Sequence, residues 1–277
     1  MSLQLNAKAE SFRAMHKPDS ILVLPNAWDA ATARVFEKAG ARAIATTSAG
    51  VAAALGYPDG QKVPRDLMVE AVARIARVVK VPVTFDMEAG YGPAPKNVAE
   101  TTEAVIRAGG VGFNLEDSTN DPPKPLLEIE EQLERIRAAR EAAERAGVRV
   151  VINARTDVYL AQVGEPVGRM QETVRRANAY KGAGADCIFV PGVTDLATLA
   201  ELVRQIPAPI NVLTTAGCPS VQDLQRIGVA RLTVGSGIMR AALAFARDAV
   251  NELLEKGSYS TFLEHTIPYQ EVNELMG

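Results

Sequence analysis

Two acids stand at the end of an apolar run in residues 81–92, VPVTFDMEAGYG. Side chains of a strand alternate between its faces, so Asp86 and Glu88 would lie on one face. Neighbouring carboxylates repel each other unless a cation, a proton or an arginine lies between them. Magnesium fits this pattern, because it binds a few carboxylates together with waters and a chelating substrate. A solvated turn with two surface acids is the alternative at this point.

The composition favours a soluble small-molecule protein. The chain has 277 residues, of which 47% are hydrophobic and 5% aromatic, so it can bury a large aliphatic core. Its formal net charge of −3 gives no basic surface for nucleic acid or an anionic membrane. We therefore expect a small-molecule substrate, no nucleic-acid partner and no membrane partner.

Histidine and cysteine are scarce. The chain contains only two histidines, His16 and His265. A catalytic triad that uses histidine, or a zinc site with several histidine ligands, therefore has almost no candidate residues. Two cysteines are too few for a disulfide framework, and the first residues lack the pattern of a signal peptide. No stretch approaches the ~18 apolar residues that a membrane span needs. A cytoplasmic location is expected, with acid–base chemistry performed by residues other than histidine.

Eight short apolar runs alternate with helical patterns along the chain. The expected strands are 21–24, 43–47, 81–85, 111–115, 149–154, 186–190, 210–213 and 230–234. The expected helices between and around them are 4–17, 27–39, 66–79, 96–108, 127–146, 167–181, 196–204, 221–227 and 238–256, before a helical tail. Repeated βα units in a chain of this length predict a closed parallel (β/α)8 barrel of the TIM type, with one domain over residues 1–277. A doubly wound open sheet is the main rival, but residues 25–28 carry no glycine fingerprint.

Polar residues collect where these strands end, which is where such a barrel has its active site. They are Asn26 and Asp29, residues 47–50, Asp86 and Glu88, Glu116 and Asp117, Arg155 and Asp157, Asn211, Ser236 and Arg240. Acids with a bridging cation and one arginine suit a substrate with several anionic oxygens, such as a 2-oxo carboxylate chelated to Mg²⁺. The turn at residues 47–50 would offer backbone N–H groups to its carboxylate.

Five motifs follow one another along almost the whole chain: TTSAGVAAALGYPDG, DMEAGYG, NLEDS, INARTD and GADCIFVP. This series resembles the isocitrate lyase and phosphoenolpyruvate mutase superfamily. The chain looks closest to a small branch of it with the start LPNAWD, residues 24–29. Members cleave or form C–C or P–C bonds beside an oxo acid through an enolate that Mg²⁺ stabilises. Many exchange the last barrel helix between subunits, so residues 238–256 are expected to swap in a homodimer or homotetramer.

The resemblance also implies roles for individual residues. Asp86 would be the principal Mg²⁺ contact, with Glu88 and Glu116 in the acidic surroundings. Asp59 would be a loop carboxylate near the reacting centre, and Arg155 would bind the substrate carboxylate or phosphonate. Substrate binding is further expected from Thr47, Ser48, Ala49 and Asn211.

One loop departs from the lyase pattern. Isocitrate and methylisocitrate lyases carry Lys-Lys-Cys-Gly-His after the Glu-Asp pair, whereas this chain reads STNDPPK at residues 118–124. The standard proton donor of those lyases is therefore missing, and polar Asn120 and Lys124 point toward the mutase and hydrolase branch. The alternatives are a lyase with an atypical acid, and a barrel that binds a 2-oxo acid without turnover. A phosphate-binding barrel enzyme of another lineage is a third, resting on Gly235-Ser236-Gly237 before the last helix.

Overall fold

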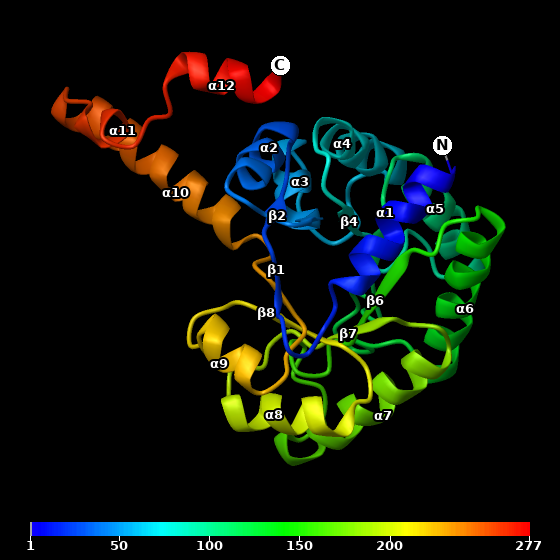
Figure 1. Cartoon of the computed structure of the whole chain (residues 1–277). Coiled ribbons are helices and arrows are strands. Elements are labelled where there is room, and N and C mark those ends of the chain that lie inside the picture. Colours follow the sequence, from blue (N-terminus) through cyan, green and yellow to red (C-terminus); the bar gives the residue numbers. More distant parts are fainter. Residues whose placement is uncertain (1) are drawn as a thin grey trace.

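The short apolar runs form one parallel sheet that curls into a nearly closed barrel in the computed structural model, which describes residues 2–277 (Figure 1). The strands are β1 (Leu22–Leu24), β2 (Asn26–Ala27), β3 (Ile44–Thr46), β4 (Val83–Asp86), β5 (Gly112–Glu116), β6 (Val151–Arg155), β7 (Cys187–Phe189), β8 (Ile210–Leu213) and β9 (Arg231–Thr233). Nearly all their side chains are buried, because helices cover the outside and side chains fill the inside. The predicted TIM-type (β/α)8 barrel is confirmed.

The first barrel strand is interrupted at Pro25, which explains nine strands where eight were expected. Leu22 of β1 pairs with Arg231 of β9, and Asn26 of β2 pairs with Ala45 of β3. Between them Pro25 has no N–H to give to the ladder, while its carbonyl accepts a hydrogen bond from the Ala45 N–H at 3.0 Å. The two ends of the sheet are thus joined through one short stretch of chain.

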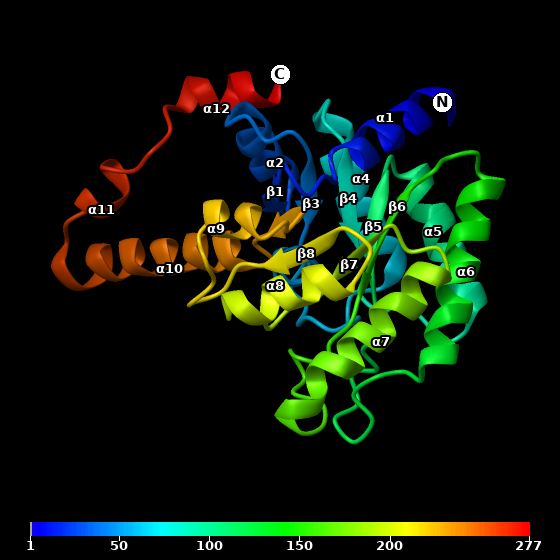
Figure 2. The same cartoon turned by 60° about the horizontal axis from the view of Figure 1, so that its bottom comes forward.

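Most of the helices lie around the outside of this sheet (Figure 2). The helices of the chain are α1 (Ser2–Ala14), α2 (Ala30–Lys38), α3 (Ser48–Ala54), α4 (Arg65–Val78), α5 (Pro95–Arg107), α6 (Ile129–Arg145), α7 (Arg169–Gly182), α8 (Leu196–Gln205), α9 (Val221–Arg226), α10 (Gly237–Asn251), α11 (Ser260–Leu263) and α12 (Tyr269–Met276), with a 3-10 turn at Pro166–Gly168 and a π-helix at Glu252–Lys256. Typical is α5, which buries Val98, Thr102 and Val105 on one face. No helix within residues 2–277 is long and apolar enough to cross a membrane.

Two helices differ from the sequence prediction near the barrel mouth. The second helix begins at Ala30 and not at residue 27, because the Asp29 carboxylate accepts the Thr32 N–H at 2.7 Å and caps it. Asp29 therefore stabilises the first turn of α2. The small residues after β3 form α3, which was not predicted, and Thr47 caps it by accepting the Gly50 N–H at 3.4 Å.

The N-terminal helix covers the end of the barrel opposite the strand ends that carry the acids. Phe12 of α1 is fully buried, and its ring lies 5.9 Å from the guanidinium of Arg231, the first residue of β9. Phe12 also packs so close to Gly112, the first residue of β5, that a Cβ there would come within 3.0 Å of the ring. Access for a substrate is therefore left to the carboxyl ends of the strands.

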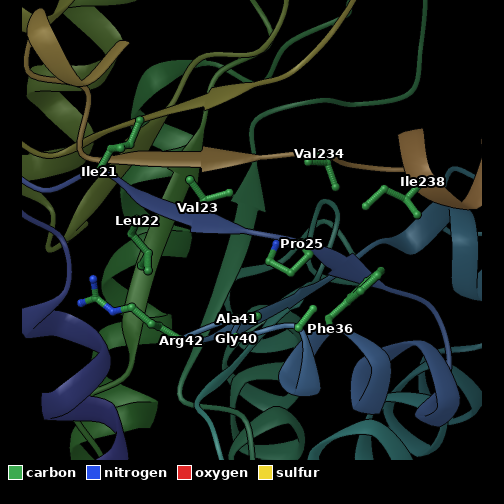
Figure 3. A pocket seen from close by; sticks show the side chains of 11 residues that line it. Ile21, Leu22, Val23, Pro25, Phe36, Gly40, Ala41, Arg42, Val234 and Ile238 are labelled. Carbon is green, nitrogen blue, oxygen red and sulfur yellow. The ribbon is translucent and has the colours of Figure 1, made fainter. Parts of the chain in front are cut away.

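The last barrel helix does not pack against its own barrel. Figure 1 shows α10 projecting away, after which the chain turns back and α12 returns to α2. Val23 in the middle of β1 is 42% exposed as a result. A cavity of about 500 Å³ lies beside it, lined by Val23, Pro25, Phe36 and Ile238 among others (Figure 3). The barrel is thus uncovered where an eighth helix would lie.

Candidate functional site

The carboxyl ends of three adjacent strands bring the predicted acids and the arginine together. Asp86, Glu116 and Arg155 are the last residues of β4, β5 and β6. The sheet register pairs Asp86 with Asn114 and Glu116 with Arg155. Since parallel strands place their ends at one edge, residues far apart in sequence meet here, as the strand pattern predicted.

Arg155 is held by two protein carboxylates. Its Nη1 lies 2.7 Å from Oε2 of Glu116, and its Nε and Nη2 donate to the two oxygens of Asp157 at 2.6 and 2.8 Å. The guanidinium also lies over the ring of Phe189, at 5.7 Å. Burial opposes its charge, but Glu116 and Asp157 raise the pKa of Arg155 far above its usual range. A guanidinium carries five N–H hydrogens, so Nη1 and Nη2 each keep a hydrogen that these two acids do not use.

Glu116 is buried in spite of its charge. Burial raises the pKa of Glu116, and the nearby charges of Asp157, Asp86 and Glu88 raise it further, while Arg155 opposes the shift. The acids therefore lie within electrostatic range of one another. A cation added among them would replace protons.

Asp86 receives hydrogen bonds from the first residue of α3 and from β5. The Ser48 N–H donates to its Oδ2 at 3.2 Å, and Nδ2 of Asn114 donates to its Oδ1 at 3.4 Å. Asn114 is itself oriented by Asn153, whose Nδ2 donates to its Oδ1 at 2.7 Å. The carboxylate is therefore fixed at the rim, and the Ser48 N–H that was predicted to bind substrate is used within the protein.

Glu88 turns away from the strand line because its backbone is left-handed, with φ of 50°. Its Oε2 accepts the Gln61 N–H at 2.6 Å, and its Oε1 accepts the Tyr91 hydroxyl at 3.2 Å. Burial, then the charges of Asp86 and Asp59, raise the pKa of Glu88 to about 7. The side-chain alternation of an extended strand therefore does not apply to Glu88.

The remaining predicted substrate-binding residues fall in different surroundings. Asn211 lies in the barrel interior, and its Nδ2 has no hydrogen-bond partner within residues 2–277. Thr47 is buried as the cap of α3, and Ala49 follows in its first turn. Asp59 lies on an exposed loop. Of these, Asn211 offers a free donor and Asp59 a free carboxylate.

Two groups were not assigned from the sequence. Asp157 follows Arg155 by two residues, which places both side chains on one face, and that spacing was the available signal. Asp117 has no such role: it is fully buried, where it accepts the Tyr180 hydroxyl at 2.7 Å and pairs with Arg176 at 3.2 Å. Burial raises the pKa of Asp117, while the Tyr180 hydrogen bond opposes the shift. Asp117 therefore joins β5 to α7.

The acid cluster fits an open magnesium site better than a closed one. Within residues 2–277 no three acids, histidines or cysteines stand close enough to enclose a metal ion. Glu88 is engaged by Gln61 and Tyr91, and Glu116 by Arg155. Magnesium nonetheless needs only one or two carboxylates, and the charges of Glu116, Asp157 and Asp86 all act on the single guanidinium of Arg155. The donor set fits the ion, while the assignment of Asp86, Glu88 and Glu116 as ligands stays a prediction.

Comparison with known proteins gives a consistent picture. The model of the phosphoenolpyruvate phosphomutase family matches residues 12–254. Oxaloacetate decarboxylase of Ectopseudomonas mendocina is 34% identical over 72% of this chain and 67% of that protein. For 2-methylisocitrate lyase of Escherichia coli the identity is 29%, over 95% of this chain and 90% of that protein. The structure of phosphonopyruvate hydrolase with oxalate and Mg²⁺ superposes with a TM-score of 0.85 and 25% identity, covering 97% of this chain and 94% of the other.

These matches span nearly all of the barrel, and the named relatives are a decarboxylase, a lyase and a hydrolase. The chain therefore belongs to the phosphoenolpyruvate phosphomutase family and is an enzyme of the PEP mutase/isocitrate lyase superfamily.

Proposed function

We propose that this chain is a Mg²⁺-dependent enzyme that cleaves or rearranges a C–C or P–C bond beside a 2-oxo carboxylate. The observation that carries the proposal is the arrangement of Asp86, Glu116 and Arg155 at the ends of three adjacent strands. Support comes from relatives that are named for oxaloacetate and phosphonopyruvate, and from the oxalate and Mg²⁺ in the solved hydrolase. Oxaloacetate and phosphonopyruvate are both 2-oxo acids with a second anionic group.

Bound magnesium would supply positive charge that stabilises the enolate oxygen of such a substrate. Asp86 would hold the ion, since two hydrogen bonds already fix its carboxylate at the rim. Arg155 would bind the substrate carboxylate with its two remaining hydrogens, because Glu116 and Asp157 prevent the guanidinium from rotating. Fixed donors of this kind stabilise developing charge without rearrangement during the reaction.

The loop at residues 118–125 has no cysteine or histidine to serve as a proton donor. Its Lys124 is directed toward α6, where Nζ lies 3.8 Å from Glu128 and 3.7 Å from Glu131. Asn120 lies beside Gly60 on the Asp59 loop. The absence of a cysteine or histidine from this loop favours a reaction that ends in hydrolysis, decarboxylation or rearrangement over the lyase reaction on isocitrate or methylisocitrate.

Product analysis by NMR tests the proposal. The purified protein is incubated with oxaloacetate, phosphonopyruvate, isocitrate or methylisocitrate, with Mg²⁺ or with EDTA. We expect magnesium-dependent product from oxaloacetate or phosphonopyruvate. Product from methylisocitrate alone would favour a lyase with an atypical acid.

A barrel that binds a 2-oxo acid without turnover is the second candidate, because the usual lyase acid is missing from the 118–125 loop. In that case the ligand would give line broadening or saturation transfer in the same NMR samples but no product. Turnover of any of the four substrates would exclude it.

We further propose that two or more copies of the chain assemble through α10. Several large apolar side chains of this helix are exposed, among them Leu243, Phe245 and Val250. The uncovered cavity beside Val23 has the place and the apolar lining that a helix from a second copy would need (Figure 3). Residues 1–277 would form one domain, and the two free cysteines agree with a cytoplasmic location.

A further inference from the structure

Three residues beside the acid cluster share a rare backbone conformation and contact one another. Gln61, Glu88 and Tyr91 have φ of 58°, 50° and 61°. The Gln61 N–H donates to Oε2 of Glu88 at 2.6 Å, and the Tyr91 N–H donates to Oε1 of Gln61 at 2.7 Å. The Tyr91 hydroxyl closes the ring on Oε1 of Glu88 at 3.2 Å. Left-handed backbone is unfavourable for such residues and persists where the surroundings fix it.

One side of this ring is rigid. Glu88 and Tyr91 belong to the turn after β4, and the buried guanidinium of Arg135 on α6 binds the carbonyls of that turn. It donates to Gly92 at 2.8 Å and to Pro93 at 2.9 Å, and also to Ala89. The turn is therefore anchored to a neighbouring barrel helix.

The other side of the ring is a loop with little support of its own. Residues 53–59 are exposed, and Val63 is the next side chain buried in the core. Asp59 is the last of these exposed residues and lies two residues before Gln61. Its charge contributes to the raised pKa of Glu88, so it lies within electrostatic range of the acid cluster. Without Gln61, the remaining supports of the loop would be buried Val63 and the Tyr57 N–H, which donates to the Ala52 carbonyl at 2.9 Å.

Gln61 of this ring also lines a cavity of about 360 Å³. Gly92 lines it from the turn after β4, and Ser118 and Thr119 line it from the loop after β5. The position of Gln61 therefore affects the width of this cavity.

We propose that Gln61, Glu88 and Tyr91 form a clasp that holds the loop at residues 55–62, and with it Asp59, against the acid cluster. Gln61 and Tyr91 are positioning residues in this account. Their effect on the reaction would come through Asp59, and this positioning of Asp59 rests on the proposed function. The tethering of the loop does not rest on it.

Hydrogen–deuterium exchange of the metal-free protein tests the tether without any substrate. Tyr91→Phe removes only the hydroxyl, and Gln61→Met keeps length while removing the acceptor. Gln61→Met loses a bond that joins the loop to the turn, and it should speed exchange of peptides covering residues 53–62 about fivefold, the effect of losing one net hydrogen bond. Tyr91→Phe loses only a bond within the turn that orients Glu88, and it should speed this exchange by a smaller factor. Both variants should leave the other barrel peptides unchanged. Tyr57→Phe, in the same exposed loop, is the matched control and should exchange as the wild type does. Unchanged exchange in both test variants overturns the clasp, whatever the enzyme proves to catalyse.

A double-mutant cycle tests the positioning role, with the Mg²⁺ affinity in the presence of oxalate measured by titration calorimetry. Asp59→Asn and Gln61→Met should each weaken it about fivefold, and the double variant should be no weaker than Asp59→Asn alone. Independent, additive losses would show that Gln61 does not act through Asp59 and would overturn this part. Failure of the proposed function would appear separately, as the absence of turnover in a wild-type protein whose clasp is intact.

Discussion

Glu116 and Arg155 are direct partners in the register of β5 and β6, and their side chains meet at 2.7 Å at the end of these strands. The guanidinium therefore has a fixed direction before any substrate arrives. Asp157, two residues after Arg155, also binds the guanidinium through both carboxylate oxygens. The proposed substrate recognition by Arg155 and the local stability would therefore depend on the same buried group of charges.

Replacing Arg155 with methionine should reduce both stability and ligand binding. Glu116 and Asp157 would be left buried without a cation, which costs about 3–5 kcal/mol when one partner of a buried pair is removed. Urea unfolding measures this loss. The control is Arg247→Met, which breaks an exposed pair with Asp248 and should leave the stability nearly unchanged. Equal losses in the two variants would contradict the buried charge group.

Stability of the metal-free protein should fall as the pH rises toward 8. The pKa of Glu88 is raised to about 7, so its stabilising contribution is full below the unfolded value of 4.5 and is lost as the pH rises through 7. Thermal unfolding from pH 5 to 8 should show this loss in the wild type relative to Glu88→Gln. Added Mg²⁺ with oxalate should restore more stability at pH 8 than at pH 5.5, since binding displaces protons. A pH-independent difference between the two proteins would count against an ionising Glu88.

Charging the apolar face of α10 should separate the proposed oligomer into single chains. Leu243 is 57% exposed on this helix. Leu243→Glu combined with Phe245→Glu should give a monomer by light scattering, because buried charges oppose the helix contact. Val167→Glu places the same charge at a residue that is 86% exposed on a 3-10 turn, and it should leave the assembly intact. A wild-type monomer at micromolar concentration would refute helix exchange.

The barrel and the strand ends could be predicted because both follow from local patterns. Apolar runs and their spacing determine the strands, and a parallel barrel places their ends together. Asp86, Glu116 and Arg155 were located in this way. The direction of Arg155 could not be predicted, because it depends on Glu116 and Asp157 in three dimensions.

Other features depend on contacts that no spacing shows. Residues 48–54 are small and gave no periodic signal, yet they form α3 because Thr47 caps it and the barrel buries it. Glu88 left the strand face because of its left-handed backbone. The direction of α10 away from the barrel depends on tertiary or quaternary contacts, because its amphipathic pattern would suit packing on its own barrel or on a second copy equally well.

The most direct test of the account is a comparison of wild type and Asp86→Ala. Asp86 is the predicted magnesium contact at the end of β4, and its side chain lies at the rim, outside the apolar core. The wild type should convert oxaloacetate or phosphonopyruvate only with Mg²⁺. The variant should show the same circular dichroism spectrum and no measurable product by NMR. Full magnesium-dependent turnover in folded Asp86→Ala would contradict the proposed site.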